Sequence, residues 1–147
     1  PRSTLPPPLF PYTTLFRSPQ LSENTEIFHN DIQGRFARGE PDIIDAMEEW
    51  AGLAQQCRDL LSQDKGQEIG PLLDRNFDLR KSIYHISQGN LAMIEAARAA
   101  GASAKFTGSG GAIVGVYDGE EMFERILSKL TPLGVKVLKP IITPQAF

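Results

Sequence analysis

Four small residues in a row, Gly108-Ser109-Gly110-Gly111, form the segment of this sequence best suited to chemistry. Glycine has no Cβ, so the chain can turn with positive φ there, and another group can approach the backbone amides closely. Successive N–H groups in such a turn can bind an anion such as a phosphate. The alternative is a plain hairpin turn, because glycine-rich links between strands are common and most of them bind nothing.

Two well-known phosphate-binding patterns do not fit this turn. A Walker loop requires Gly-Lys-Ser/Thr at the start of a helix, whereas Ala112 and Ile113 follow here and begin an apolar run. A dinucleotide fingerprint that starts at Gly108 would require Gly or Ala where Ile113 stands, and it would also require a helix after the turn. Both classes of nucleotide site are therefore excluded.

Asn76 and Arg80 are candidate substrate-binding residues, because they lie one helical turn apart on an otherwise apolar stripe. A buried guanidinium without a partner is costly. The carboxylate of an anionic substrate would satisfy Arg80 and would suit its planar fork. The alternatives are an internal pair with Asp78 or a nearby carbonyl, or a helix that ends earlier and leaves Arg80 in water.

Lys105 is a third candidate, because it precedes the turn in an apolar segment. In a strand its side chain points away from that of Phe106 and lies on the same side as Thr107. There it could place a positive charge near phosphates. The alternative is an ordinary solvated lysine on a strand.

The composition excludes several classes of protein. Fifteen Lys and Arg stand against eighteen Asp and Glu, for a net charge of −3, so there is no basic excess for binding nucleic acid. No apolar run is long enough to span a membrane. Cys57 is alone, and with His29 and His85 it makes neither an internal disulfide nor a zinc ligand set. We therefore expect a cytoplasmic protein without a metal site of its own.

Hydrophobic periodicity predicts an α+β domain. Helices are expected over residues 27–37, 41–61, 69–84, 88–100 and 120–130, and strands over residues 102–107, 112–117 and 135–138. In the second helix we expect the core-facing stripe to consist of Ile43, Ile44, Met47, Trp50, Ala51, Ala54, Cys57 and Leu61. Helices then pack on a small, mainly antiparallel sheet in the order ααα-α-ββαβ. Since such sheets usually have four or more strands, another strand is expected upstream, or a cover over one edge.

Residues 1–18 differ from the rest of the chain. They are rich in proline, no Met occurs before Met47, and residues 11–18 resemble the translation of a sequencing-adapter read-through. We expect this segment to be foreign to the natural protein, or else a disordered natural linker. In either case it should contribute neither a helix nor a central strand, and no function. The domain proper is expected over residues 19–147.

A longer window around the turn resembles a known family. Residues 96–112, with the sequence AARAAGASAKFTGSGGA, closely resemble the third signature motif of the GHMP kinases, the galacto-, homoserine, mevalonate and phosphomevalonate kinases. The order of helices, strands and turn is also similar to that family's C-terminal domain. The segment NFDLR at residues 76–80 and the Gly-Gly-Ala end of the turn resemble the glucuronokinase branch. The resemblance covers about residues 27–142.

This resemblance implies an enzyme that transfers the γ-phosphoryl group of ATP, with Mg²⁺, to a hydroxyl of a small molecule. In the glucuronokinase branch the product is glucuronate 1-phosphate. It also implies that Thr107, Gly108, Ser109, Gly110 and Gly111 shape the active site beside the transferred phosphate. In the family the phosphate loop and the catalytic residues belong to the N-terminal half, and no such segment occurs in these 147 residues. We therefore expect an inactive piece whose missing N-terminal domain supplies the catalytic residues and most contacts to ATP and Mg²⁺.

A different class of protein remains open. In a non-catalytic α+β domain that binds a small ligand or another protein, residues 108–111 would only turn a hairpin. The upstream sequence distinguishes the two interpretations. A phosphate loop rich in Gly, Ser and Ala, about one domain length earlier, would support the kinase, and its absence would favour the binding module.

Overall fold

The computed structural model describes the backbone of residues 13–17 and 25–140 and the side chains of residues 31–140. Its helices, in chain order, are α1 (Thr25–Ala37), α2 (Pro41–Ser62), the short 3-10 helix η1 (Gly66–Ile69), α3 (Gly70–Ile83), α4 (Gln88–Ala99), α5 (Gly119–Leu130) and the 3-10 turn η2 (Thr131–Leu133). Its strands are β1 (Thr13–Arg17), β2 (Ser103–Phe106), β3 (Ala112–Val116) and β4 (Lys136–Leu138). Every helix and strand expected from the sequence is present.

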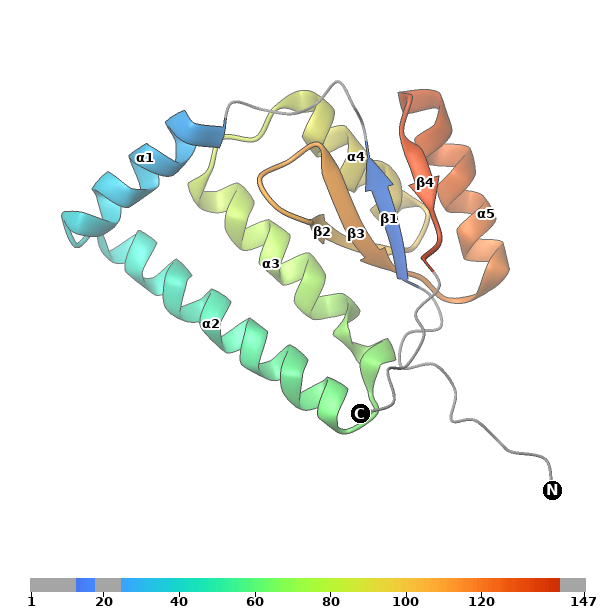
Figure 1. Ribbon diagram of the computed structural model, residues 1–147, viewed down its shortest axis with the longest axis horizontal. Helices are drawn as coiled ribbons and strands as arrows, with labels where there is room; N and C mark the ends of the chain where they lie inside the picture. The colour runs from blue at the N-terminus through green and yellow to red at the C-terminus, as the bar shows by residue number, and fades with distance from the viewer. Residues whose placement is uncertain (1–12, 18–24, 141–147) are drawn as a thin grey trace.

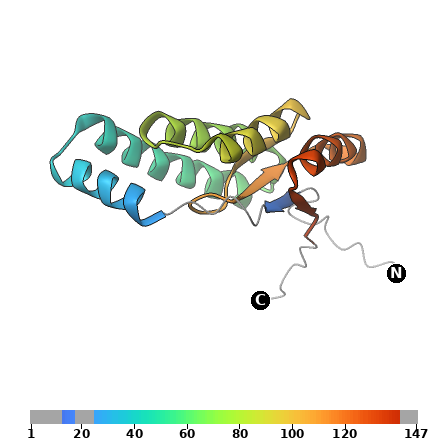
Figure 2. The ribbon, with the colours of Figure 1, turned by 90° about the horizontal axis from the view of Figure 1, so that it is seen from above.

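The four strands form one antiparallel sheet in the order β2-β3-β1-β4. Helices α3, α4 and α5 lie on one side of this sheet, and α1 and α2 extend away from it (Figures 1 and 2). The predicted fold class, an α+β domain with helices packed on a small antiparallel sheet, is confirmed.

The core lies between α4, α5 and the covered face of the sheet. It contains apolar side chains from every one of these elements and from α3: Phe77, Met93, Ile94, Ala97, Ala104, Phe106, Ile113, Ile126 and Leu130. Phe77 and Phe106 meet edge to face, with 5.2 Å between ring centroids, a preferred geometry for aromatic pairs. Since the alternating residues of β2 and β3 bury one face, this packing fixes which residues of the hairpin turn inward.

Strand β1 corrects the expectation that residues 1–18 contribute no central strand. Thr13–Arg17 pairs with β3 on one side and β4 on the other, so it is a central strand. The prolines of this region stop at Pro11 and resume at Pro19, and the strand Thr13–Arg17 lies between them. Its five residues include two Thr, a Leu and a Phe, which favour strands. Whether residues 1–18 are foreign stays a prediction, and residues 1–12 and 18 lie outside the described part of the chain.

The buried face of α2 also differs from the expected stripe. Ala51 and Ala54 are exposed, whereas Ala46 and Leu53 are buried together with Ile43. Apolar residues occupy more than half of the helix circumference here, so periodicity alone leaves the direction of the buried face uncertain by one position. Trp50 remains half-buried and packs toward α3.

Helix α3 runs along the outer edge of β2, and Asp74 joins the two elements. Its carboxylate accepts a hydrogen bond from the backbone N–H of Ala104 at 3.0 Å. The same oxygen accepts from Nε of Arg98 on α4 at 3.0 Å, and Arg98 also donates to the backbone carbonyl of Asp74. The Asp74 side chain thus accepts a hydrogen bond from a backbone N–H of the edge strand β2 and connects α3 and α4 to the sheet.

We expect Asp74→Ala to lower the free energy of unfolding by about 1–3 kcal/mol, because it leaves the buried Ala104 N–H without its partner. Urea denaturation of the 147-residue chain measures this loss. Asp78→Ala is the matched control, since it removes only an exposed ion pair with the same Arg98 and should change stability little. Equal losses in both variants would contradict the role given to Asp74.

Candidate functional site

The glycine-rich turn joins β2 and β3 as expected, and Thr107 closes it at its base. The backbone N–H of Thr107 and its hydroxyl both donate to the carbonyl of Ala112, at 3.1 and 3.3 Å. Gly110 and Gly111 have φ of +149° and +73°, a region that residues with a Cβ rarely adopt. The turn therefore requires glycine at these two positions.

Arg80, on α3, holds the first half of the turn. Its guanidinium donates to the carbonyls of Gly108 and Ser109, at 2.9 and 3.2 Å. It also lies against the rings of Tyr84 and Phe106, at 4.9 and 5.3 Å from their centroids, which favours one orientation of the cation. In a planar trans peptide the N–H points opposite to the carbonyl. Arg80 thus directs the N–H groups of Ser109 and Gly110 away from α3.

Asn90, at the start of α4, holds the second half. Its side chain is fully buried, and Oδ1 accepts from the backbone N–H of Gly111 at 2.8 Å. Nδ2 donates to the hydroxyl of Ser87 at 3.2 Å. A Cβ on Gly110 would lie 2.9 Å from Nδ2, so the turn packs directly on this amide.

Sequence reasoning missed Asn90 as a site residue. Polar residues in the first turn of a helix are common, so its type alone carries no signal. The position of Asn90 does carry a signal, because Met93, Ile94 and Ala97 follow at spacings of three, four and seven residues and share its face of the helix. A polar residue that begins a buried stripe indicates a specific buried partner.

The structure supplies Arg80 with the nearby carbonyls that were one of the alternatives considered for it. Asn76 is half-buried, and its backbone carbonyl accepts from the indole N–H of Trp50 at 3.2 Å. Arg80 and Asn76 thus lie on the side of α3 that faces Trp50 of α2. The ring centroids of Trp50 and Tyr84 are 6.4 Å apart. Their role in substrate binding stays a prediction.

Lys105 lies on the face of the sheet opposite to Phe106, in agreement with the expected alternation. It is half-buried, and its ammonium donates to the backbone carbonyl of Phe106 at 2.6 Å. Burial lowers the pKa of this ammonium, and the neighbouring Arg80 guanidinium lowers it further, while the Cys57 thiol acts in the opposite direction. The site thus contains two adjacent cations.

The ligand types that could hold a metal ion are not gathered in this part of the molecule. Within the described residues, no group of three or more His, Cys, Asp and Glu side chains is arranged around a common point. His85 is exposed, and the side chain of His29 lies outside the described residues. Over the same residues, no helix combines the length and the apolar character needed to cross a membrane.

The chemistry available to this arrangement is anion binding by a rigid backbone. Arg80 and Asn90 fix both halves of the turn, and a Cβ added at Gly108 would meet no heavy atom of the described residues within 4 Å beyond its two chain neighbours. Backbone N–H groups do not titrate, and they stabilise negative charge without reorganising. A phosphate oxygen could therefore approach the turn from the side opposite to α3.

Two of the solved structures with the same fold are mevalonate kinases. The chain matches mevalonate kinase of L. major, solved with R-mevalonate, with a TM-score of 0.75 and 19% identity over 88% of this chain and 43% of that one. Mevalonate kinase of Staphylococcus aureus matches with a TM-score of 0.60 and 10% identity, over 88% and 42% of the two chains. The Lin0012 protein of Listeria innocua reaches 0.79 and 15% identity, over 97% and 41%. The fold is that of a GHMP-kinase C-terminal domain.

Two curated relatives are named as glucuronokinases. Probable glucuronokinase 2 of Arabidopsis thaliana is 42% identical over 89 residues, and glucuronokinase 1 of the same plant is 36% identical over 89 residues. Each match covers 58% of this chain, which spans about a quarter of the length of these relatives. No family model matches. The resemblance to GHMP kinases, and to glucuronokinases among them, is confirmed.

Proposed function

We propose that this chain is the C-terminal part of a kinase that transfers the γ-phosphoryl group of ATP to glucuronate, giving glucuronate 1-phosphate. Its kinase relatives and its fold support phosphoryl transfer. The names of the two glucuronokinases support glucuronate as the acceptor. Since the match spans about a quarter of each relative, we place the catalytic residues and the Mg²⁺ ligands in the preceding part of the complete protein.

The observation that carries the proposal is the double attachment of the turn. Arg80 fixes the carbonyls of Gly108 and Ser109, while Asn90 fixes the N–H of Gly111. The N–H groups of Ser109 and Gly110 are then the donors that would face phosphate oxygens of ATP. Phosphoryl transfer depends on positioning and on neutralising charge spread over these oxygens. A turn whose two halves are both held by hydrogen bonds suits these two requirements.

A screen of acceptors with the complete protein tests this function. ATP consumption is followed with glucuronate, galacturonate, galactose and mevalonate, each with Mg²⁺. We expect the highest kcat/KM with glucuronate and no activity from the 147-residue chain alone, because that chain lacks the other half of the site. A complete, folded protein that consumes ATP with none of these acceptors would refute the assignment.

A further inference from the structure

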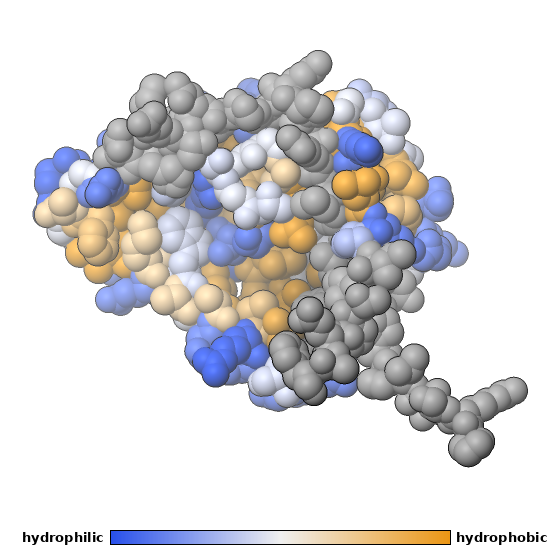
Figure 3. All heavy atoms as spheres, viewed as in Figure 1, coloured by the Kyte–Doolittle hydropathy of each residue, from blue (hydrophilic) through white to orange (hydrophobic). Residues whose placement is uncertain are grey.

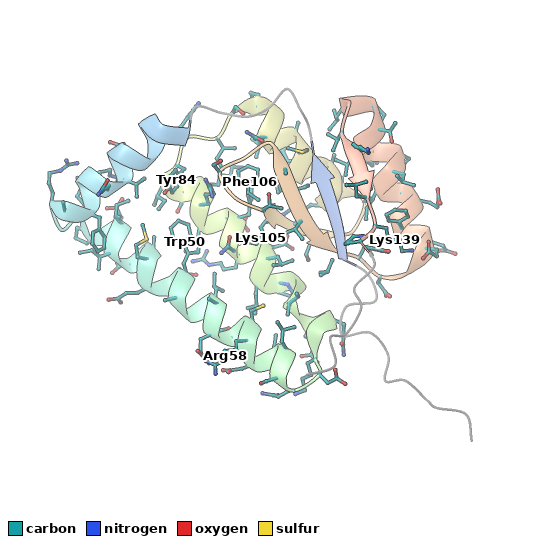
Figure 4. The ribbon with its side chains drawn as sticks, in the orientation of Figure 1. Trp50, Arg58, Tyr84, Lys105, Phe106 and Lys139 are labelled. Carbon is teal, nitrogen blue, oxygen red and sulfur yellow. The ribbon has the colours of Figure 1, made fainter. Side chains whose placement is uncertain are left out.

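Beside the glycine turn, the surface is recessed between α2 and the sheet (Figure 3). Figure 4 shows Lys105, Trp50 and Tyr84 around this recess, with contributions from β2, α2 and the end of α3. Cys57, two helical turns after Trp50 on the same side of α2, is close enough to act on the pKa of Lys105. Three separate elements thus contribute side chains to one hollow.

The recess carries positive charge from Lys105 and from the Arg80 guanidinium that acts on it. Among the described residues, the groups that shift the pKa of Lys105 are this guanidinium and Cys57. Among the described residues its hydrogen-bond partner is the backbone carbonyl of Phe106, which is neutral. Placing a second cation beside a half-buried ammonium costs free energy, and a bound anion would recover it.

The walls of the recess suit a ring-shaped ligand. Trp50 is held by its hydrogen bond to the carbonyl of Asn76, and its ring stands 6.4 Å from that of Tyr84. Tyr84 in turn lies against the Arg80 guanidinium, which is hydrogen-bonded to the turn. Fixed aromatic faces with a few convergent polar groups are typical of sites for small organic molecules.

We propose that Lys105 binds the carboxylate of the sugar-acid acceptor in this recess, with Trp50 and Tyr84 as the walls along its ring. Arg80 is the positioning residue of the site, because the same guanidinium adds positive potential and holds the turn that would face the phosphate. The assignment rests on the proposed function. It places the acceptor's anionic end on the α2 side of the turn, so that Lys105 selects acids over neutral sugars.

A phosphate of the nucleotide is the other anion that the same charge could attract. The two sources differ in which Michaelis constant depends on Lys105. If the carboxylate is the ligand, loss of the charge raises KM for the acceptor and leaves KM for ATP unchanged. If the phosphate is the ligand, the dependence is reversed.

The test uses Lys105→Met in the complete protein, with Lys105→Arg as the conservative variant and Lys81→Met, an exposed lysine of α3, as the matched control. We expect Lys105→Met to raise KM for glucuronate roughly 10- to 100-fold, the value of one charge-assisted hydrogen bond, with KM for ATP unchanged. Lys105→Arg should restore most of the affinity. The methyl ester of glucuronate should show the same KM in the wild-type and Met proteins.

Three results would overturn this assignment. They are a selective rise in KM for ATP, an equal rise for both substrates, or an unchanged KM for glucuronate. The shift in Tm caused by added glucuronate gives a second readout, and we expect it to disappear in Lys105→Met. Should that variant fail to fold, Lys105→Gln replaces it and is judged by the same criteria. Failure of the proposed function is distinguishable, because the unsubstituted protein would then phosphorylate no sugar acid.

Discussion

Replacing Gly110 by valine in the complete protein is expected to lower kcat roughly 100-fold while the protein stays folded. Gly110 has a φ of +149°, and any Cβ there would stand 2.9 Å from Nδ2 of the buried Asn90. Valine must therefore displace the turn or the amide beneath it, and either movement misdirects the donors at Ser109 and Gly110. Steady-state kinetics with ATP and glucuronate, together with circular dichroism, measure the two parts of this expectation.

Gly108→Ala is the matched control for this variant. Gly108 lies in the same turn, but its φ is outside the positive region, and apart from its chain neighbours no described residue lies within 4 Å of a Cβ placed there. We therefore expect kcat to stay within a few-fold of the wild type, since alanine fits the backbone without strain. If Gly110→Val kept full turnover, the turn would have no part in catalysis.

The second large effect is expected for Asn90→Leu. Leucine has a similar volume but leaves the buried N–H of Gly111 without its acceptor, which costs about 1–3 kcal/mol. It also frees one half of the turn, so kcat should fall more than KM rises. Urea denaturation of the 147-residue chain gives the stability, and kinetics of the complete protein give kcat and KM.

Ser87→Ala separates the two hydrogen bonds of this amide. It removes the hydroxyl that accepts from Nδ2 and leaves the bond between Oδ1 and Gly111 in place. We expect a smaller loss of stability and a nearly normal kcat. A Ser87→Ala variant as impaired as Asn90→Leu would show that the helix start, rather than the hold on the turn, determines activity.

The hairpin that carries the site could be predicted because its signals are local. Apolar and polar residues alternate before residues 108–111 and an apolar run follows them, and the alternation alone places Lys105 opposite to Phe106. The same local logic marked Arg80 as a polar residue on an apolar stripe. In each case the information lies within one helical turn or one strand.

The partners of these residues could not be predicted, because they come from distant segments. Arg80 meets carbonyls 28 and 29 residues further along the chain, and Asn90 meets an amide 21 residues away. No periodicity encodes such separations. Strand β1 was missed for a related reason, since a five-residue segment between prolines becomes a strand only through pairing with β3 and β4.

The way in which α3 lies along β2 has a consequence for how the molecule behaves in concentrated solution. An uncovered strand invites another chain to continue the ladder, which is a common route to aggregation. Here Asp74 already occupies the outward N–H of Ala104. The opposite edge of the described sheet is the three-residue strand β4. Lys136 in β4 and Lys139 directly after it are exposed, and Pro140 follows. A short edge strand with lysines and a nearby proline discourages pairing with a strand of another molecule.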